Sequence, residues 1–380
     1  MSILLRLIIV PTTIFAVVAC TGKPERPRMA KTFDGSSAAL KSTKIIPTLE
    51  SPLEKDHNAV WCSSFLAAWK SLSDDIAKAD IAIGGSPPAA ELLNKSDDPR
   101  PHTPAGSMYV ATGWKHKGII DKINLDLKTA FPAKAAPTFP GIVDNSFVAY
   151  SYLEANLQFP LPYFQNRSPL EFTDSLGRKT KVASFGIRAE DDYAYYKLRN
   201  QPHILFRKGK AGDPDLEFAV DLCAESSPSQ IIVARIQREP TLAAALKRLD
   251  KEEIAAQQFK KENPDYAKYQ GKIGPNDVLL VPDLFWQISH RYSELEGRSF
   301  SNPSLKGQCL DIAQQDILFR LDRSGAELKS ESKMYCAPVP TYFVLDRPFL
   351  ICMKKRGRQS RTPGPRRPGA SDPQGPSASP

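Results

Sequence analysis

The 380-residue sequence lacks the short motifs that identify many catalytic and metal sites. It contains no G-x-S-x-G nucleophile turn, no H-E-x-x-H zinc pair and no G-x-x-x-x-G-K-[ST] phosphate loop. Its five histidines are scattered without ligand spacing, so each is interpreted as an ordinary surface or core residue. We therefore predict that the protein is not an enzyme and has no catalytic residue, metal ligand or cofactor.

Cysteines are also few, and none of the six stands in C-x-x-C spacing. That excludes zinc ribbons and thioredoxin-type redox motifs. Five cysteines follow Cys20, and this odd number leaves at least one thiol free or paired outside the chain. Burial as small hydrophobic side chains is expected for most of them.

A basic surface is missing as well, although the formal net charge is +9. Residues 1–44 contain seven Lys or Arg against two acidic residues, and residues 351–380 contain seven against one. The body between them has 37 basic and 39 acidic residues, a net charge of −2. Because a nearly neutral body offers no phosphate-binding face, we predict no nucleic-acid partner.

The N-terminus has the pattern of an export signal. An apolar stretch from Leu7 to Ala19 follows Arg6 and is interrupted by Pro11, which makes it too short for a comfortable membrane span. It ends Val-Val-Ala-Cys and resembles a bacterial lipobox, so Cys20 is the predicted lipidation site. Residues 1–20 would be a signal peptide and 21–44 a flexible tether, placing an exported, membrane-anchored lipoprotein in the periplasm or on the cell surface. An ordinary signal peptide with an incidental cysteine is the alternative.

The remaining sequence predicts an α+β fold, with helices concentrated early and mainly antiparallel sheets later. Apolar periodicity predicts helices over 63–77, 118–131 and 241–262, whereas 83–103 is expected to be irregular. From Asn145 onward the predicted elements are β-strands and hairpins, which cover 147–159, 170–187, 203–222, 230–236, 277–288, 316–322 and 341–353.

The order of these segments resembles the serpin family. "LLVPDLFWQISHRYSELEG" is similar to the serpin stretch "VPKF…L…LG", "LFRLDRSGAELKSES" to the hinge "EEGTEAAAAT", and "FVLDRPFLICM" to "F.ADHPFLF.I". The resemblance covers residues 145–353 in order and 58–145 more weakly, where helices of a full serpin are missing. It implies a serpin-like domain over 45–357. In the alternative of an unrelated α+β protein, 328–338 is simply a surface connection.

In inhibitory serpins the loop after the hinge inserts into a sheet, so its residues decide what the resemblance implies. The hinge-like stretch consists of Gly325, Ala326, Glu327, Leu328, Lys329, Ser330 and Glu331. The first three match the family, but the last four replace an alanine run, and Arg323 replaces an acidic residue two positions before the glycine. Placing Lys329 or Glu331 between strands would bury an unpaired charge.

We therefore expect a non-inhibitory protein that acts as a binding or scaffold protein. The alternative is an inhibitor of a serine or cysteine protease that uses the 325–340 loop, and a second alternative is an unrecognised enzyme. The implied partner is another protein or a protease, together with the membrane through the lipid.

The C-terminal residues 358–380 differ sharply from the rest. They include six prolines in 23 residues and no aliphatic or aromatic residue larger than alanine. Such a sequence cannot bury enough surface to fold, so a disordered tail is predicted. A serpin ends instead with one more apolar strand, which suggests a frameshift in the coding sequence. The alternative is a genuine basic tail able to touch anionic surfaces.

Overall fold

The computed structural model describes residues 43–356, except for Asp56, Asn156, 189–196, Ala211, Pro214, 265–270 and 324–340. Contacts divide the chain into Met1–Lys31 and Thr32–Pro380, and every described residue belongs to the second unit. Its elements are helices and mostly antiparallel sheets, which confirms the α+β prediction. The first strand, β1 (Thr43–Ile45), starts two residues before the predicted domain boundary.

Three of the α-helices are those that the apolar periodicity predicts. They are α1 (Ser63–Leu72), which continues into the π-helical turn η1 (Ser73–Ala77), then α3 (Ile119–Ala130) and α5 (Leu242–Glu262). Thr241 accepts a hydrogen bond from the backbone N–H of Ala244 and so caps α5. Short 3₁₀ turns occupy η2 (Arg100–His102), η3 (Lys115–Lys117) and η4 (Pro303–Leu305).

The prediction that 83–103 is irregular was wrong. Helix α2 (Pro88–Lys95) lies inside it and buries Ala90 and Leu93. Proline at the first helical position fits a helix start, because its missing N–H has no partner there in any case. The surrounding prolines and serines concealed a helix of only two turns.

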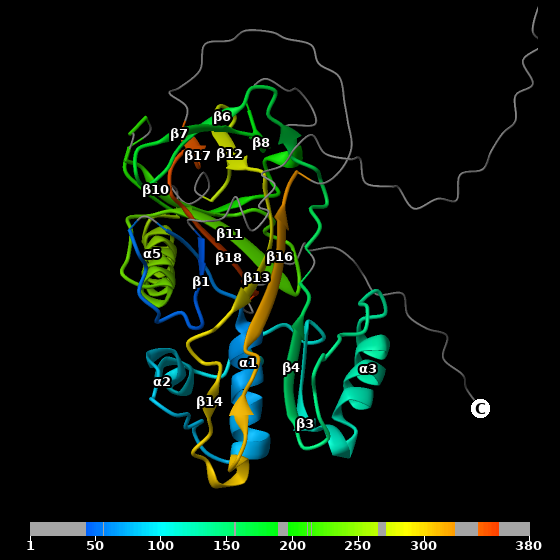
Figure 1. Ribbon diagram of the computed structural model, residues 1–380. Coiled ribbons are helices and arrows are strands. Elements are labelled where there is room, and N and C mark those ends of the chain that lie inside the picture. The colour runs from blue at the N-terminus through cyan, green and yellow to red at the C-terminus, as the bar shows by residue number, and fades with distance from the viewer. Residues whose placement is uncertain are drawn as a thin grey trace, which may run out of the picture. The chain divides into compact units, whose positions relative to one another are not determined.

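A four-stranded antiparallel sheet has the order β18–β11–β10–β9. Its strands are β9 (His203–Lys208), β10 (Glu217–Asp221), β11 (Ser229–Arg235) and β18 (Leu350–Lys355). All seven residues of β11 are buried, because a core cluster around Phe218 covers one face and α5 covers the other with Leu249. Figure 1 shows α5 beside this sheet.

The second four-stranded sheet has the order β17–β12–β8–β5. It consists of β5 (Phe164–Gln165), β8 (Ser184–Ile187), β12 (Val278–Pro282) and β17 (Tyr342–Val344), and β12 pairs with β17 in parallel. Two predicted strands are therefore pairs of strands. Residues 277–288 divide at Asp283, and 341–353 divide after Val344, because the chain passes from one sheet to another at each point.

Two antiparallel strand pairs with long connections, called hairpins below, pack on α1. One joins β3 (Met108–Trp114) to β4 (Phe147–Leu153), and the other joins β13 (Leu284–Arg291) to β16 (Gln314–Leu321). Both contribute side chains to the cluster around Trp69 of α1, and α3 covers the other face of β3–β4 (Figure 1). Smaller strands complete the fold, namely β2 (Asn58–Val60), β6 (Leu170–Thr173), β7 (Lys179–Val182), β14 (Arg298–Ser299) and β15 (Cys309–Leu310).

Candidate functional site

The residues predicted to matter for function fall outside the described part of the chain. This holds for Cys20, for the hinge-like residues 325–331 and for the tail 358–380. What the structure describes is the point from which the hinge-like stretch departs, namely the end of β16 with Asp322 and Arg323.

Two buried aspartates lie at this end of the β13–β16 hairpin. Leu284 pairs with Leu321 in the hairpin register, so Asp283 and Asp322 stand opposite one another one step beyond that pair. Asp283 is 4% exposed and Asp322 is 8% exposed. We call Asp283 and Asp322 the acid pair.

Neighbouring elements bind Asp283, whereas a residue of the preceding strand β16 binds Asp322. Gln165 of β5 donates from Nε2 to Asp283 Oδ2 at 2.8 Å, and the Asp283 amide donates to the carbonyl of Ala183 at 2.9 Å. Arg320 Nε donates to Asp322 Oδ2. Asp283 thereby connects the β13–β16 hairpin to the sheet that contains β5 and β8.

Burial disfavours the charged form of Asp283 and is the main reason that its pKa is raised. The hydrogen bond from Gln165 lowers this pKa, the charge of Asp322 raises it, and the charges of Arg323 and Arg320 lower it. Among the described residues, Oδ1 of Asp283 has no hydrogen-bond partner. A buried carboxyl oxygen without a donor is costly, so this position is not optimised for stability.

The signs of the charges here are the reverse of those in the serpin resemblance. Asp283 stands where the quoted stretch "VPKF" has lysine, and Arg323 stands where the hinge has an acidic residue. Of these departures the sequence analysis noted only Arg323, and only the fold brings Asp283 and Arg323 close enough for their charges to interact.

A backbone hydrogen bond also joins two segments beside the acid pair. The amide of Tyr163, which follows β4 in the chain, donates to the carbonyl of Arg323 at 3.2 Å. Farther along the hairpin, β16 pairs only with β13 and β4 only with β3 among the described strands. Phe147 and Ala149 of β4 and Ile317 of β16 contact one apolar cluster on α1.

The outer face of β16 is open to solvent. Leu318 is 65% exposed, and Asp316 and Arg320 are also exposed. A strand placed beside β16 would therefore bury only the side chains that face α1, while its other side chains would stay in water.

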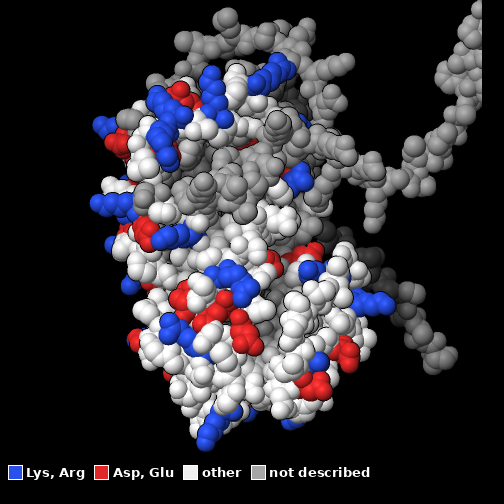
Figure 2. Space-filling view, in the orientation of Figure 1, with Lys and Arg blue, Asp and Glu red and all other residues white. Residues whose placement is uncertain are grey.

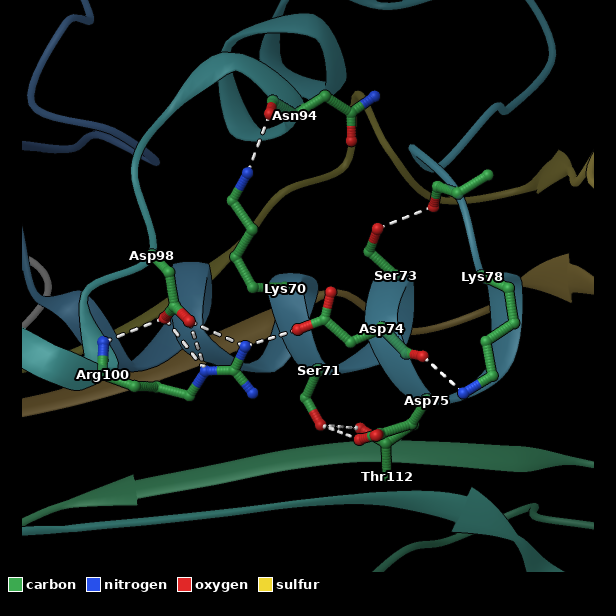
Figure 3. Close-up of polar contacts among 11 residues, drawn as sticks. Lys70, Ser71, Ser73, Asp74, Asp75, Lys78, Asn94, Asp98, Arg100 and Thr112 are labelled. Atoms are coloured by element: carbon green, nitrogen blue, oxygen red, sulfur yellow. Dashed lines mark hydrogen bonds and ion pairs between the residues drawn. The ribbon is translucent and has the colours of Figure 1, made fainter.

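A second polar cluster surrounds η1, and Figure 3 shows its contacts. Arg100 lies between Asp98 and Asp74, at 2.8 Å and 2.5 Å, beside a surface pocket of about 360 Å³ lined by residues 73, 74 and 78–80. Lys78 has a left-handed φ of 57° and donates to the carbonyl of Asp74 at 2.7 Å.

π-helical turns often occur at functional sites. Here, however, the polar groups bind one another. Lys70 donates to the carbonyl of Asn94 in α2 at 2.8 Å, and Ser73 donates to the carbonyl of Ala79 at 2.6 Å. We interpret this cluster as the connection between α1, η1 and α2.

Neither cluster has the donors of a metal site. Within the described ranges, no group of three or more His, Cys, Asp or Glu side chains is placed to hold a metal ion. Cys62, Cys223, Cys309 and Cys352 are free thiols; Cys223 is buried, Cys309 is exposed and the other two are half-buried. No helix in the described part of the chain is long and apolar enough to cross a membrane.

Charged side chains of both signs lie next to one another over the face seen in Figure 2. Several lysines and arginines on this face have acidic neighbours, as the body's net charge of −2 leads one to expect. Examples are the ion pairs of Lys179 with Glu171 and of Arg248 with Glu217.

No protein-family model matches the chain, and no curated protein matches its sequence. The matching solved structures are serpins. Human thyroxine-binding globulin matches at 12% identity and a TM-score of 0.32 over 63% of this chain and 61% of that protein. Protease nexin-1 with heparin matches at 12% and 0.35 over 62% and 61%, and native tengpin, a thermophilic serpin, at 12% and 0.32 over 62% and 58%.

These matches agree with the serpin-like resemblance of the sequence. The chain covers less than two thirds of the length of these serpins, and the TM-scores lie below 0.5. Nothing about activity, ligand or partner follows from them.

Proposed function

We propose that the chain is an exported serpin-like protein that binds another protein without catalysing a reaction and without inserting its loop. A lipid on Cys20 would hold it at the membrane surface of the periplasm or the cell. The observation that supports non-insertion is the hydrogen bond from Tyr163 to the carbonyl of Arg323 beside the acid pair.

Insertion would have to begin at this bond. A strand that enters beside β16 would separate Tyr163 from Arg323 and add backbone next to two buried carboxyl groups. Polar groups buried without full compensation oppose that step. The loop would then remain outside the sheet, where it is available to a partner.

A protease inhibitor remains the second candidate, because residues 326–334 read AELKSESKM. Uncharged residues alternate with charged ones, the charged set being Glu327, Lys329, Glu331 and Lys333. A strand of this pattern fits a site with one apolar and one solvent-exposed face. The exposed outer face of β16 is of that kind, so one register would bury none of these charges.

A protease panel separates the two candidates. The full chain is mixed with serine and cysteine proteases, and the products are boiled in detergent and separated by electrophoresis. We expect cleaved chain and free protease. A band at the summed mass that survives boiling would establish the inhibitor instead.

A charge-exchanged variant sharpens this experiment. Asp283→Lys with Arg323→Glu restores the signs of the serpin resemblance at both positions. A complex that forms only with this double variant would identify the reversed charges as the barrier to insertion. Lys354→Glu with Asp250→Lys, which exchanges an exposed ion pair on the β18 side of the fold, is the matched control.

Lipidation is tested in cells grown with a clickable fatty acid. The wild type should be labelled and Cys20→Ser should not. Cys309→Ser is the matched control, because this thiol is exposed on β15 and should leave the label unchanged. Equal labelling of the wild type and Cys20→Ser would reject the anchor.

A further inference from the structure

The acid pair lies at a junction within the fold, and the proposed function does not depend on this position. It lies where two parts of the fold meet, since Asp283 separates β12 from β13 and the chain changes sheet there. Gln165 of β5 and Ala183, which immediately precedes β8, bind Asp283 from the side of the sheet β17–β12–β8–β5, and Asp322 lies opposite it in the β13–β16 hairpin. Any change at Asp283 therefore acts on the connection between these two parts.

The charges around Asp283 come from a small set of groups. Asp322 is the acidic neighbour, and Arg320 and Arg323 at the end of β16 are the basic ones. From β5 the facing group is the uncharged amide of Gln165, which donates to Oδ2. Arg320 donates from Nε to Asp322, and Oδ1 of Asp283 has no hydrogen-bond partner among the described residues.

A proton on Asp283 would correct both defects of this arrangement. It would remove one of the two negative charges whose repulsion raises the pKa of Asp283, and it would turn an acceptor without a donor into an O–H that can itself donate. Paired carboxyl groups elsewhere share one proton for the same reason. The hydrogen bond from Gln165 to Oδ2 needs no change in either state.

We infer that protonation of the acid pair controls how stably the β13–β16 hairpin is connected to the sheet β17–β12–β8–β5. The connection is tight when Asp283 is protonated and looser when Asp283 is ionised. In an exported domain, the acid pair would respond to the pH outside the cell. This inference does not depend on whether the chain inhibits a protease.

The direction of the pH dependence follows from the raised pKa of Asp283. A carboxyl group whose folded pKa lies above its ordinary value of 3.8 binds its proton more tightly in the folded state. Its stabilising contribution is complete below the ordinary value and is lost as the pH rises through the raised one. Acid should therefore strengthen this junction.

Amide hydrogen exchange of the full chain measures the effect locally. The two reporters are the amide of Tyr163, bonded to Arg323, and the amide of Asp283, bonded to Ala183. Their protection, corrected for intrinsic exchange, should rise severalfold in the wild type as the pH falls from neutral towards the ordinary value. In Asp283→Asn, which imitates the protonated acid in shape and charge, protection should be high and independent of pH.

Asp316→Asn is the control, because Asp316 is an exposed acid on the same strand β16 and should leave the pH dependence of the wild type in place. The same pH dependence in Asp283→Asn as in the wild type would overturn the inference. Should Asp283→Asn not fold, the carboxyl carbon of Asp283 is titrated by NMR in the wild type. A midpoint above 3.8 is then expected, and one at or below 3.8 would equally overturn it.

Discussion

Two buried aspartates show how differently the two main parts of the fold treat charge. Asp221, in the sheet β18–β11–β10–β9, pairs with Arg356 at 2.8 Å and accepts from Gln230 at 3.1 Å and from the Cys223 amide at 3.0 Å. Asp283 has the side-chain donor Gln165 on one oxygen and an acidic neighbour. The first is a satisfied structural site, whereas the second retains a cost that protonation or a partner can change.

Burial follows the same division. Every residue of β11 is buried between two apolar layers, while β16 alternates between a face on α1 and a face in water. A strand covered on both faces cannot accept a neighbour above or below it. The hairpins on α1 are a described region where another strand or a partner could add without dismantling a core.

The largest loss of stability is expected when the ion pair of Asp221 with Arg356 is broken. Arg356→Met leaves the carboxyl group of Asp221 buried without its cation, and it also removes donors to the carbonyls of Cys223 and Ser226. Breaking a buried pair from one side costs about 3–5 kcal/mol, so the midpoint of urea unfolding should fall strongly. Lys355→Met, at the exposed neighbouring position, should change it little. Equal midpoints for Arg356→Met and the wild type would contradict this account of the sheet.

A smaller loss of stability is expected when the contact between α5 and the same sheet is weakened. Leu249 is 0% exposed and packs among Leu205, Phe206 and Ile232. Leu249→Ala should destabilise the protein by about 2–5 kcal/mol, with the lower part of the range expected if the helix settles into the cavity. Ile254→Ala on the exposed side of α5 serves as the comparison, since Ile254 is 66% exposed. Similar urea midpoints for the two variants would mean that α5 is not packed as described.

The two parts should also respond to acid in opposite directions. Burial lowers the pKa of His203 on β9, Lys260 and Arg356 lower it further, and Asp221 raises it. A lowered histidine pKa means that stability is lost as the pH falls through 6.5, the ordinary value. The β9 amides should therefore lose exchange protection in acid while those at Asp283 gain it, and His203→Asn should abolish only the β9 change. If exchange protection in acid changed in the same direction at β9 and at Asp283, the proposed difference between the two regions would be wrong.

How much the sequence revealed depended on the pattern of each segment. The three long apolar periodicities located α1, α3 and α5 correctly, because each buries one continuous stripe. Helix α2 was missed, since a two-turn helix among prolines leaves a weak signal. The division of 277–288 and 341–353 into two strands each was missed as well, because a run of apolar residues does not reveal a change of sheet.

Only part of the candidate site could be predicted from the sequence. Arg323 was recognised as a departure from the serpin hinge, but Asp283 looked like one acidic residue inside a strand. Only the pairing of Leu284 with Leu321 brings Asp283 opposite Asp322, across 39 positions of sequence. The alternation of charge over 326–334 was visible in the sequence, and its meaning became clear from the exposed face of β16.

The central claim is that this chain binds without inserting its loop, and the thermal stability of the cleaved protein tests it most directly. The full chain is cut once between Met334 and Pro340 and its melting temperature is compared with that of the intact protein. We predict a change within about 2 °C, which corresponds to less than about 1 kcal/mol for a domain of this size. A large rise on cleavage would mean that the freed segment completes a sheet, and it would contradict the non-inserting function proposed for this protein.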